Sequence, residues 1–161
     1  MSEPVKYIER IRNQYARLGY KSYTWVTNRG EPPWTPLKKP IRESRLGLVA
    51  SGGIYRLGQV AFHYKDDVSL RAIPSTVPTH DLRVTHFAYD MTAARRDPNV
   101  VFPIDTLRNL VSERVIDEIA EHAYTFMGGI YSARRVKEEL APAIRERLQA
   151  DKVDVALLVP V

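Results

Sequence analysis

Apolar residues recur at helical spacing in three stretches of the chain. In the first stretch they lie three or four residues apart, so they fall on one face of an N-terminal helix: Val5, Ile8, Ile11, Tyr15 and Leu18. Ser2 is placed to cap this helix, with Glu3 and Pro4 in its first turn, and Gly19 to end it. The same periodicity predicts helices over residues 104–115 and 132–150, with a kink or restart at Pro142.

Short apolar runs predict the strands, at residues 46–50, 83–87, 124–127 and 155–159. The first run is continuous and ends at glycines, which is typical of a strand buried on both faces. Residues 58–82 are polar and contain Pro74 and Pro78, so they predict a long loop. Strands that alternate with helices indicate an α/β fold, and we predict a Rossmann-like layered domain built on a parallel sheet.

Proline separates an N-terminal arm from this domain. Residues 28–40 hold four prolines, which predicts an extended connector pinned by Trp34. We therefore expect an arm over residues 1–44 and the α/β domain over residues 45–161. Residues 153–161 predict a central strand, after which no covering helix follows, so we expect the domain to be incomplete at its C-terminus.

Charge is concentrated in the arm. Residues 1–45 hold ten Lys/Arg and four Asp/Glu, whereas the rest of the chain is nearly neutral. Such an arm can bind nucleic acid or an acidic partner, but interleaved basic and apolar residues favour a solvated helix face. The absence of cysteine excludes disulfides, zinc–thiolate sites and iron–sulfur clusters within these 161 residues. Neither a membrane span nor a secretory signal is evident. We therefore expect a cytoplasmic protein that has no membrane as a partner.

Candidate chemistry gathers after the predicted strands, where open α/β sheets bind ligands. Ser51, Gly52 and Gly53 follow the first strand and form either a tight turn or an anion-binding backbone. Gly128 follows a later strand, and Val161 follows the last. Without G-x-G-x-x-G spacing or a P-loop lysine, a nucleotide site is not supported.

His86 and Asp90 bring an imidazole and a carboxylate within five residues. Such a pair can act as a general acid or base, although a histidine satisfied by local hydrogen bonds is the simpler alternative. Asn99, between Asp97 and Asp105, fits turn and capping chemistry. The remaining histidines lack metal-ligand spacing, so we predict no metal site.

Two segments resemble those of a known family. Residues 71–75 have the sequence RAIPS, and residues 81–90 have the pattern D-L-R-x-x-H-x-x-Y-D. These segments are similar to those in selenoprotein B of the glycine, sarcosine, betaine and D-proline reductases, in its N-terminal half. Further similar segments occur in the same order at residues 34–36, 50–53, 97–110, 126–128, 142–144 and 153–158.

The resemblance implies a subunit that cleaves a C–N bond of a small amino acid or amine reductively. In the family, a selenocysteine or cysteine follows the strand that matches residues 155–159, so the redox residue is expected beyond Val161. A pyruvoyl group in a companion subunit and a dithiol reductant such as thioredoxin are also implied. The predicted catalytic residues are His86 and Asp90, and the predicted substrate-binding residues are Ser51, Gly52, Gly53, Tyr89, Asn99 and Gly128.

Two positions depart from the family pattern. Tyr55 stands where the family often has histidine, and Val100 where it often has cysteine. This difference favours another small amine or amino acid as substrate. The alternative function is a non-catalytic α/β module that binds a small ligand or another subunit. Both interpretations allow the chain to form homo-oligomers. The small basic excess disfavours nucleic acid as a binding partner.

Overall fold

The computed structural model describes residues 4–22 and 26–161, and the chain divides into two compact units, Met1–Trp34 and Thr35–Val161. In the first unit, helix α1 spans Tyr7–Arg17. Gly19, with a φ of 81°, follows it as the sequence predicts. The predicted capping residues Ser2 and Glu3 lie outside the described residues. The predicted boundary between residues 44 and 45 stays a prediction.

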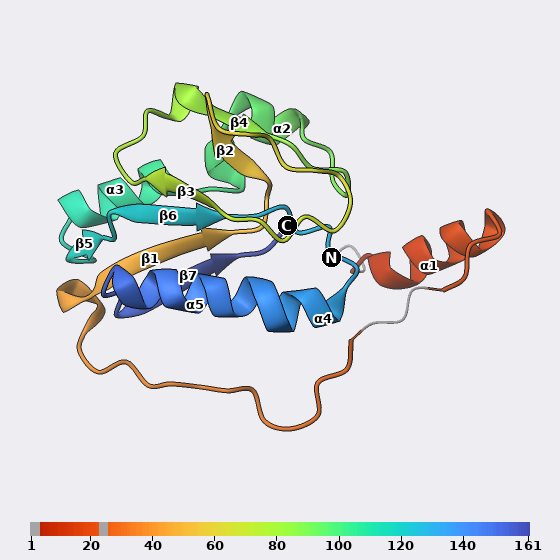
Figure 1. The fold of residues 1–161 in the computed structure, drawn as a ribbon, viewed down its shortest axis with the longest axis horizontal. Coiled ribbons are helices and arrows are strands. Elements are labelled where there is room, and N and C mark those ends of the chain that lie inside the picture. Colours follow the sequence, from red (N-terminus) through yellow and green to blue (C-terminus); the bar gives the residue numbers. More distant parts are fainter. Residues whose placement is uncertain (1–3, 23–25) are drawn as a thin grey trace. The chain divides into compact units, whose positions relative to one another are not determined.

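The second unit is built on a mostly parallel sheet (Figure 1). Strand β1 (Arg45–Ala50) lies inside it, and each parallel pairing involves this strand: with β5 (Glu118–Ile119), β6 (His122–Thr125) and β7 (Val155–Val159). Strand β3 (Arg71–Pro74) is antiparallel to β6. The prediction of an α/β fold with a mainly parallel sheet is confirmed.

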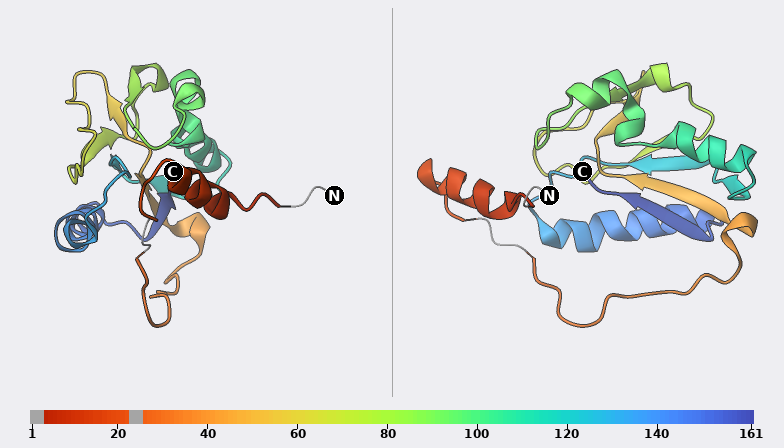
Figure 2. Two further views of the ribbon diagram at one scale, coloured as in Figure 1. Left: turned by 90° about the vertical axis from the view of Figure 1, so that its right-hand side faces the viewer. Right: turned by 180° about the vertical axis from the view of Figure 1, so that it is seen from behind.

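Helices cover both faces of this sheet (Figures 1 and 2). One face packs against α3 (Ile104–Ser112), with α2 (Thr92–Arg96) and the antiparallel pair β2 (Ile54–Arg56) and β4 (Leu82–Val84) beyond it. The other face packs against α4 (Ala133–Arg135), a π-helical turn (Val136–Leu140) and α5 (Ala141–Ala150). Three 3₁₀ turns complete the described part: Ile41–Glu43, Thr79–Asp81 and Pro98–Val100.

The two faces of β1 pack differently. Leu46, Leu48 and Ala50 belong to the main core, whose largest fully buried side chain is Phe102. Gly47 lies on the face toward α5, where a Cβ atom would come within 2.8 Å of Leu148 and Val153. Because this position lacks a side chain, α5 can approach the sheet closely.

A buried tyrosine links the sheet to the end of α5. The Tyr124 hydroxyl, on β6, donates a hydrogen bond to the Asp151 carboxylate at 2.7 Å. Burial, together with this carboxylate, raises the pKa of Tyr124 to about 12. The phenol therefore remains a neutral donor at all physiological pH values.

Several short strands are missing from the sequence-based prediction. The segment predicted as a loop over residues 58–82 contains β3, and β2 and β5 are absent from the prediction. Strand β3 tolerates Pro74 because it lies at the edge of the sheet order and pairs only with β6 among the described residues. The predicted restart at Pro142 is confirmed, because α5 begins at Ala141 after the π-helical turn.

The prediction that residues 153–161 form a central strand is wrong. Within the described part of the chain, β7 pairs with β1 alone and so has an open edge. Its side chains are half-buried or exposed in alternation, and Leu158 is 65% exposed. A cavity of about 610 Å³ lies between β7 and α5, lined in part by Val49, Ile144, Leu148, Ala156 and Leu158. None of the helices in residues 4–22 and 26–161 is long and apolar enough to span a membrane.

The open edge of β7 predicts self-association. An unpaired strand edge beside an exposed leucine favours pairing with another chain. We expect sedimentation coefficients that rise with concentration or, where the edge stays unpaired, amide exchange over residues 153–161 that is faster than in β1. Leu158→Lys should weaken association about tenfold or more, because one leucine side chain contributes about 1.5–3 kcal/mol when buried.

Leu57→Lys is the matched control, because Leu57 is 59% exposed in a turn away from β7. This substitution should leave association unchanged. A strictly monomeric chain whose last strand is as protected as β1 would contradict the prediction.

Candidate functional site

The parallel strands β1, β6 and β7 end on the same side of the sheet (Figure 1). Ser51, which follows β1, hydrogen-bonds to the chain at the ends of the other two. Its amide donates to the Val159 carbonyl at 3.0 Å, and its own carbonyl accepts from the Gly128 amide at 2.8 Å. The Ser51 hydroxyl accepts a hydrogen bond from the Val161 amide at 2.9 Å. The ends of β1, β6 and β7 therefore meet at one residue, where the sequence predicts a ligand crevice.

The two glycines after Ser51 are required by close packing. Gly53 has a φ of 71°, and a Cβ atom there would overlap the Thr85 carbonyl oxygen. A Cβ atom at Gly52 would come within 2.9 Å of Val101 and 3.4 Å of Val161. The Gly53 amide donates to the Phe126 carbonyl. Of the two alternatives for this segment, the contacts favour a tight turn over an anion-binding backbone.

His86 lies against this turn with an unsatisfied nitrogen. The side chain is 5% exposed, and its Nδ1 accepts a hydrogen bond from the Ala88 amide at 3.0 Å. This bond fixes the neutral tautomer that carries hydrogen on Nε2, and no described residue accepts from that buried atom. Burial lowers the pKa of His86 below its ordinary value, so the ring is neutral at pH 7.

Tyr89 connects His86 to the turn. The two rings lie 4.7 Å apart, and the Tyr89 hydroxyl donates to the Gly52 carbonyl at 2.9 Å. Burial raises the pKa of Tyr89, so the phenol also stays neutral. The structure thus brings together six of the predicted residues: Ser51, Gly52, Gly53, His86, Tyr89 and Gly128.

Asp90 does not pair with His86. Its Oδ1 accepts hydrogen bonds from the Thr92 amide at 2.9 Å and the Thr92 hydroxyl at 2.6 Å. These two bonds lower the pKa of Asp90. The geometry therefore agrees with the simpler alternative, in which a local hydrogen bond satisfies one side of the His86 ring. It does not agree with an imidazole oriented by the Asp90 carboxylate. The catalytic roles predicted for both residues stay predictions.

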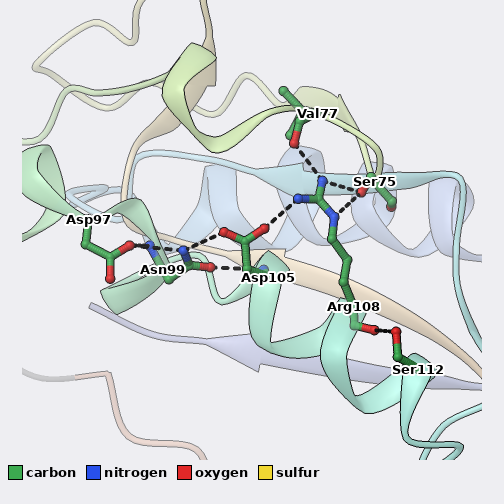
Figure 3. A network of polar contacts seen from close by, with 7 residues as sticks. All are labelled: Ser75, Val77, Asp97, Asn99, Asp105, Arg108 and Ser112. Atoms are coloured by element: carbon green, nitrogen blue, oxygen red, sulfur yellow. Dashed lines mark hydrogen bonds and ion pairs between the residues drawn. The ribbon is translucent and has the colours of Figure 1, made fainter.

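Asn99 belongs to a separate polar network, shown in Figure 3. Its amide nitrogen donates to Asp97 and Asp105 at 3.0 Å each, and its oxygen accepts from the Asp105 amide at 3.0 Å. Asp97 also accepts from the Asn99 backbone amide, which matches the capping alternative. Both amide hydrogens of Asn99 are therefore occupied, and a substrate that accepts a hydrogen bond from this side chain would have to displace an aspartate.

Arg108 anchors this network to the rest of the fold (Figure 3). Its guanidinium donates to Asp105 at 2.6 Å, to the Ser75 carbonyl at 2.9 and 2.6 Å, and to the Val77 carbonyl at 2.6 Å. The amide of Asn99 and the Arg108 guanidinium hold the pKa of Asp105 below its ordinary value. No role for Arg108 is predicted from the sequence, although its i, i+3 spacing from Asp105 is typical of an ion pair on a helix.

Aromatic and apolar side chains complete the surroundings of the turn. The Phe87 ring stacks on His86 with centroids 5.9 Å apart, and a Cβ atom at Gly129 would overlap Phe87. Val101 fills the space beside Gly52. With His86 and Tyr89 neutral, the free hydrogen-bond donor among the described side chains against the turn is the His86 Nε2–H.

Comparison with known proteins agrees with the motifs. A sequence model of the glycine/sarcosine/betaine reductase selenoprotein B family matches residues 30–160. The chain belongs to this family. It is 33% identical over 140 residues to the D-proline reductase subunit gamma of Acetoanaerobium sticklandii, which covers 87% of the chain and 58% of that protein.

A second relative is more distant. The glycine reductase complex component B subunit gamma of Symbiobacterium thermophilum is 29% identical over 141 residues, covering 79% of this chain and 30% of that protein. The chain thus spans 58% of the length of one curated relative and 30% of the other. No solved structure matches the chain.

The neutral state of His86 predicts a loss of stability in mild acid. Histidine in the unfolded chain takes up a proton near pH 6.5, whereas buried His86 resists it to lower pH. Below pH 6.5 the unfolded chain thus binds more protons, and the free energy of unfolding falls by up to about 1.4 kcal/mol per pH unit. Urea denaturation between pH 7 and 5.5 should show this slope reduced in His86→Gln.

His80→Gln controls for the loss of any histidine, because the His80 side chain is 83% exposed. It should keep the wild-type slope. The proton resonances of the His86 ring give an independent titration in the wild-type chain. Titration of His86 at or above pH 6.5 would contradict the prediction.

The Arg108 network predicts that replacing this arginine lowers stability even when the positive charge is kept. Arg108→Lys keeps the positive charge but cannot reach Asp105 and both carbonyls at once. We expect a loss of about 1–3 kcal/mol in the free energy of unfolding, measured in urea. Arg134→Lys, in an exposed ion pair with Glu138, should cost about 0.5 kcal/mol or less. Equal effects of the two substitutions would show that Arg108 acts only by its charge.

Proposed function

We propose that this chain is part of a subunit of a reductase that cleaves a C–N bond of a small amino acid or amine. The observation that carries the proposal is the family match over residues 30–160. The arrangement of its motifs supports it, because the segments that resemble the family meet at the ends of β1, β6 and β7. The relative named as a D-proline reductase subunit makes a cyclic or secondary amine a reasonable substrate class.

The proposed reaction separates a carbon from a nitrogen, and each atom gains one hydrogen. The two electrons and two protons come from a dithiol such as that of thioredoxin, which leaves as a disulfide. The redox residue that mediates this exchange is proposed to be a selenocysteine or cysteine beyond Val161, because the family has one after the matching strand. A selenol suits this role because it is ionised at neutral pH and is easily reduced again.

In the proposed reaction, the crevice orients the redox residue and the substrate. The amide of Val161 is held by the Ser51 hydroxyl, so a residue after it would leave the sheet beside Gly52. His86 would offer an uncharged hydrogen-bond donor to a substrate carboxylate or carbonyl through its unsatisfied Nε2. The Tyr89 hydroxyl, which donates its hydrogen to the Gly52 carbonyl, would hold the turn in place and could accept a hydrogen bond from the substrate. Because its Nδ1 is occupied by Ala88, His86 would act through Nε2.

The proposed reductase contains companion subunits. The relatives are named as gamma subunits of a reductase and of a reductase complex component. A pyruvoyl group in a companion subunit would activate the substrate amine when present. On the same grounds of family resemblance, we propose that the assembly is cytoplasmic. We also propose that the mostly parallel sheet belongs to a Rossmann-like domain.

The test is to determine the gene sequence after Val161 and to express the longer reading frame with its companion subunits. Glycine, sarcosine, betaine and D-proline are offered with dithiothreitol. The product measured is the released ammonia or amine, or, for D-proline, the ring-opened amino acid with its new primary amine. The 161-residue chain alone should show no dithiol-dependent cleavage, because it has no cysteine. The longer chain should cleave one substrate, and Tyr89→Phe should lower kcat/KM about tenfold.

Tyr64→Phe provides the matched control, because Tyr64 is 68% exposed. Its kinetics should equal those of the unsubstituted longer chain. Cleavage by the 161-residue chain, or none by the longer chain with its companions, would overturn the proposal. In the second case, a binding or subunit-interaction module becomes the better description.

A further inference from the structure

Helix α1 carries an apolar stripe that no described residue of its own unit covers. All side chains of α1 are exposed, including Ile8 and Ile11 at 51% and 49%, and Leu18, which follows the helix, is 67% exposed. At about 100° per residue, Tyr7, Ile8, Ile11, Tyr15 and Leu18 fall within a band about 100° wide. Asn13 and Glu9 lie on the opposite side. The band is therefore a continuous face suited to an apolar groove.

Arginines border this stripe on both sides. Helical spacing places Arg12 about 40° beyond one edge of the stripe. Arg10 and Arg17 lie about 60° and 80° beyond the other edge, next to Gln14. Among the described residues of its own unit, 4–22 and 26–34, no carboxylate forms an ion pair with any of the three. An apolar face flanked by guanidinium groups is complementary to an apolar groove whose rim carries carboxylates.

The short length of α1 also favours packing of this helix against another surface. It spans 11 residues, about 16 Å, and lacks a side-chain cap at its N-terminus. Helices shorter than about 12–15 residues are marginal in water without packing. Residues 28–40, which follow α1 in the sequence, hold four prolines, a composition typical of an extended spacer.

From these observations we propose that α1 is a docking helix for a companion protein subunit, which offers an apolar groove with an acidic rim. A second copy of this chain is disfavoured, because the bordering arginines of two copies would face one another. The proposal rests on the proposed function, in which the chain works within a complex. It goes beyond the family match, which begins at residue 30 and does not include α1.

The test measures binding of the full chain to the purified companion subunits of the reductase by biolayer interferometry. Ile11→Asp places a charge in the stripe and should raise Kd at least tenfold. Asn13→Asp adds the same charge on the opposite face and should change Kd less than twofold. Arg10→Glu combined with Arg17→Glu should weaken binding and make it less sensitive to salt.

Each contrary result has a distinct meaning. If the complex forms and Ile11→Asp leaves Kd unchanged, the docking role of α1 is wrong while the proposed reductase function stands. If no complex forms and the longer chain has no reductase activity, both proposals fail. If Ile11→Asp lowers the melting temperature of the isolated chain, the stripe packs on its own body and docking is wrong. Binding to phosphatidylglycerol vesicles in place of the subunits would also overturn it.

Discussion

The pairing of β1 with β7 is the constraint on which the rest of the body depends. The two strands run parallel in an uninterrupted register from Leu46 with Val155 to Ala50 with Val159. They lie more than 100 residues apart in sequence, so the pairing closes the chain around everything between them. Hydrogen bonds from Asp154 and Val161 to β1 and its following turn extend the ladder at both ends. Such a non-local parallel pairing is slow to form but defines one register.

The candidate site is a consequence of this register. With β7 in place, Val161 reaches the Ser51 hydroxyl and packs beside Gly52. A shift by one residue would turn the half-buried Val155, Leu157 and Val159 away from the core. The site and the core therefore rest on the same alignment, and Gly52 and Gly53 are the positions where the chain can approach itself closely enough.

Long apolar runs made part of the fold predictable. The runs that became β1, β6 and β7 and the periodic segments that became α3 and α5 are recognisable in sequence because burial alone sets their pattern. Strands β2 and β5 were not predictable, because two or three residues give no period and their pairing depends on distant partners. The edge position of β7 was also hidden, since an apolar run gives the burial of a strand only when its neighbours are known.

The same limit applies to the site residues. Strand ends locate Ser51, Gly52 and Gly128 because topology alone brings the carboxyl ends of parallel strands together. The spacing of His86 and Asp90 gives no side-chain direction, and local backbone amides at Ala88 and Thr92 engage both groups. Short polar side chains satisfy neighbouring amides before they reach a distant partner, since that costs less conformational entropy. His86 Nε2 is the exception within the described turn. Among the described residues it is the buried side-chain donor that has no hydrogen-bond partner, and leaving such a donor unpaired costs stability unless a ligand or a water molecule accepts its hydrogen.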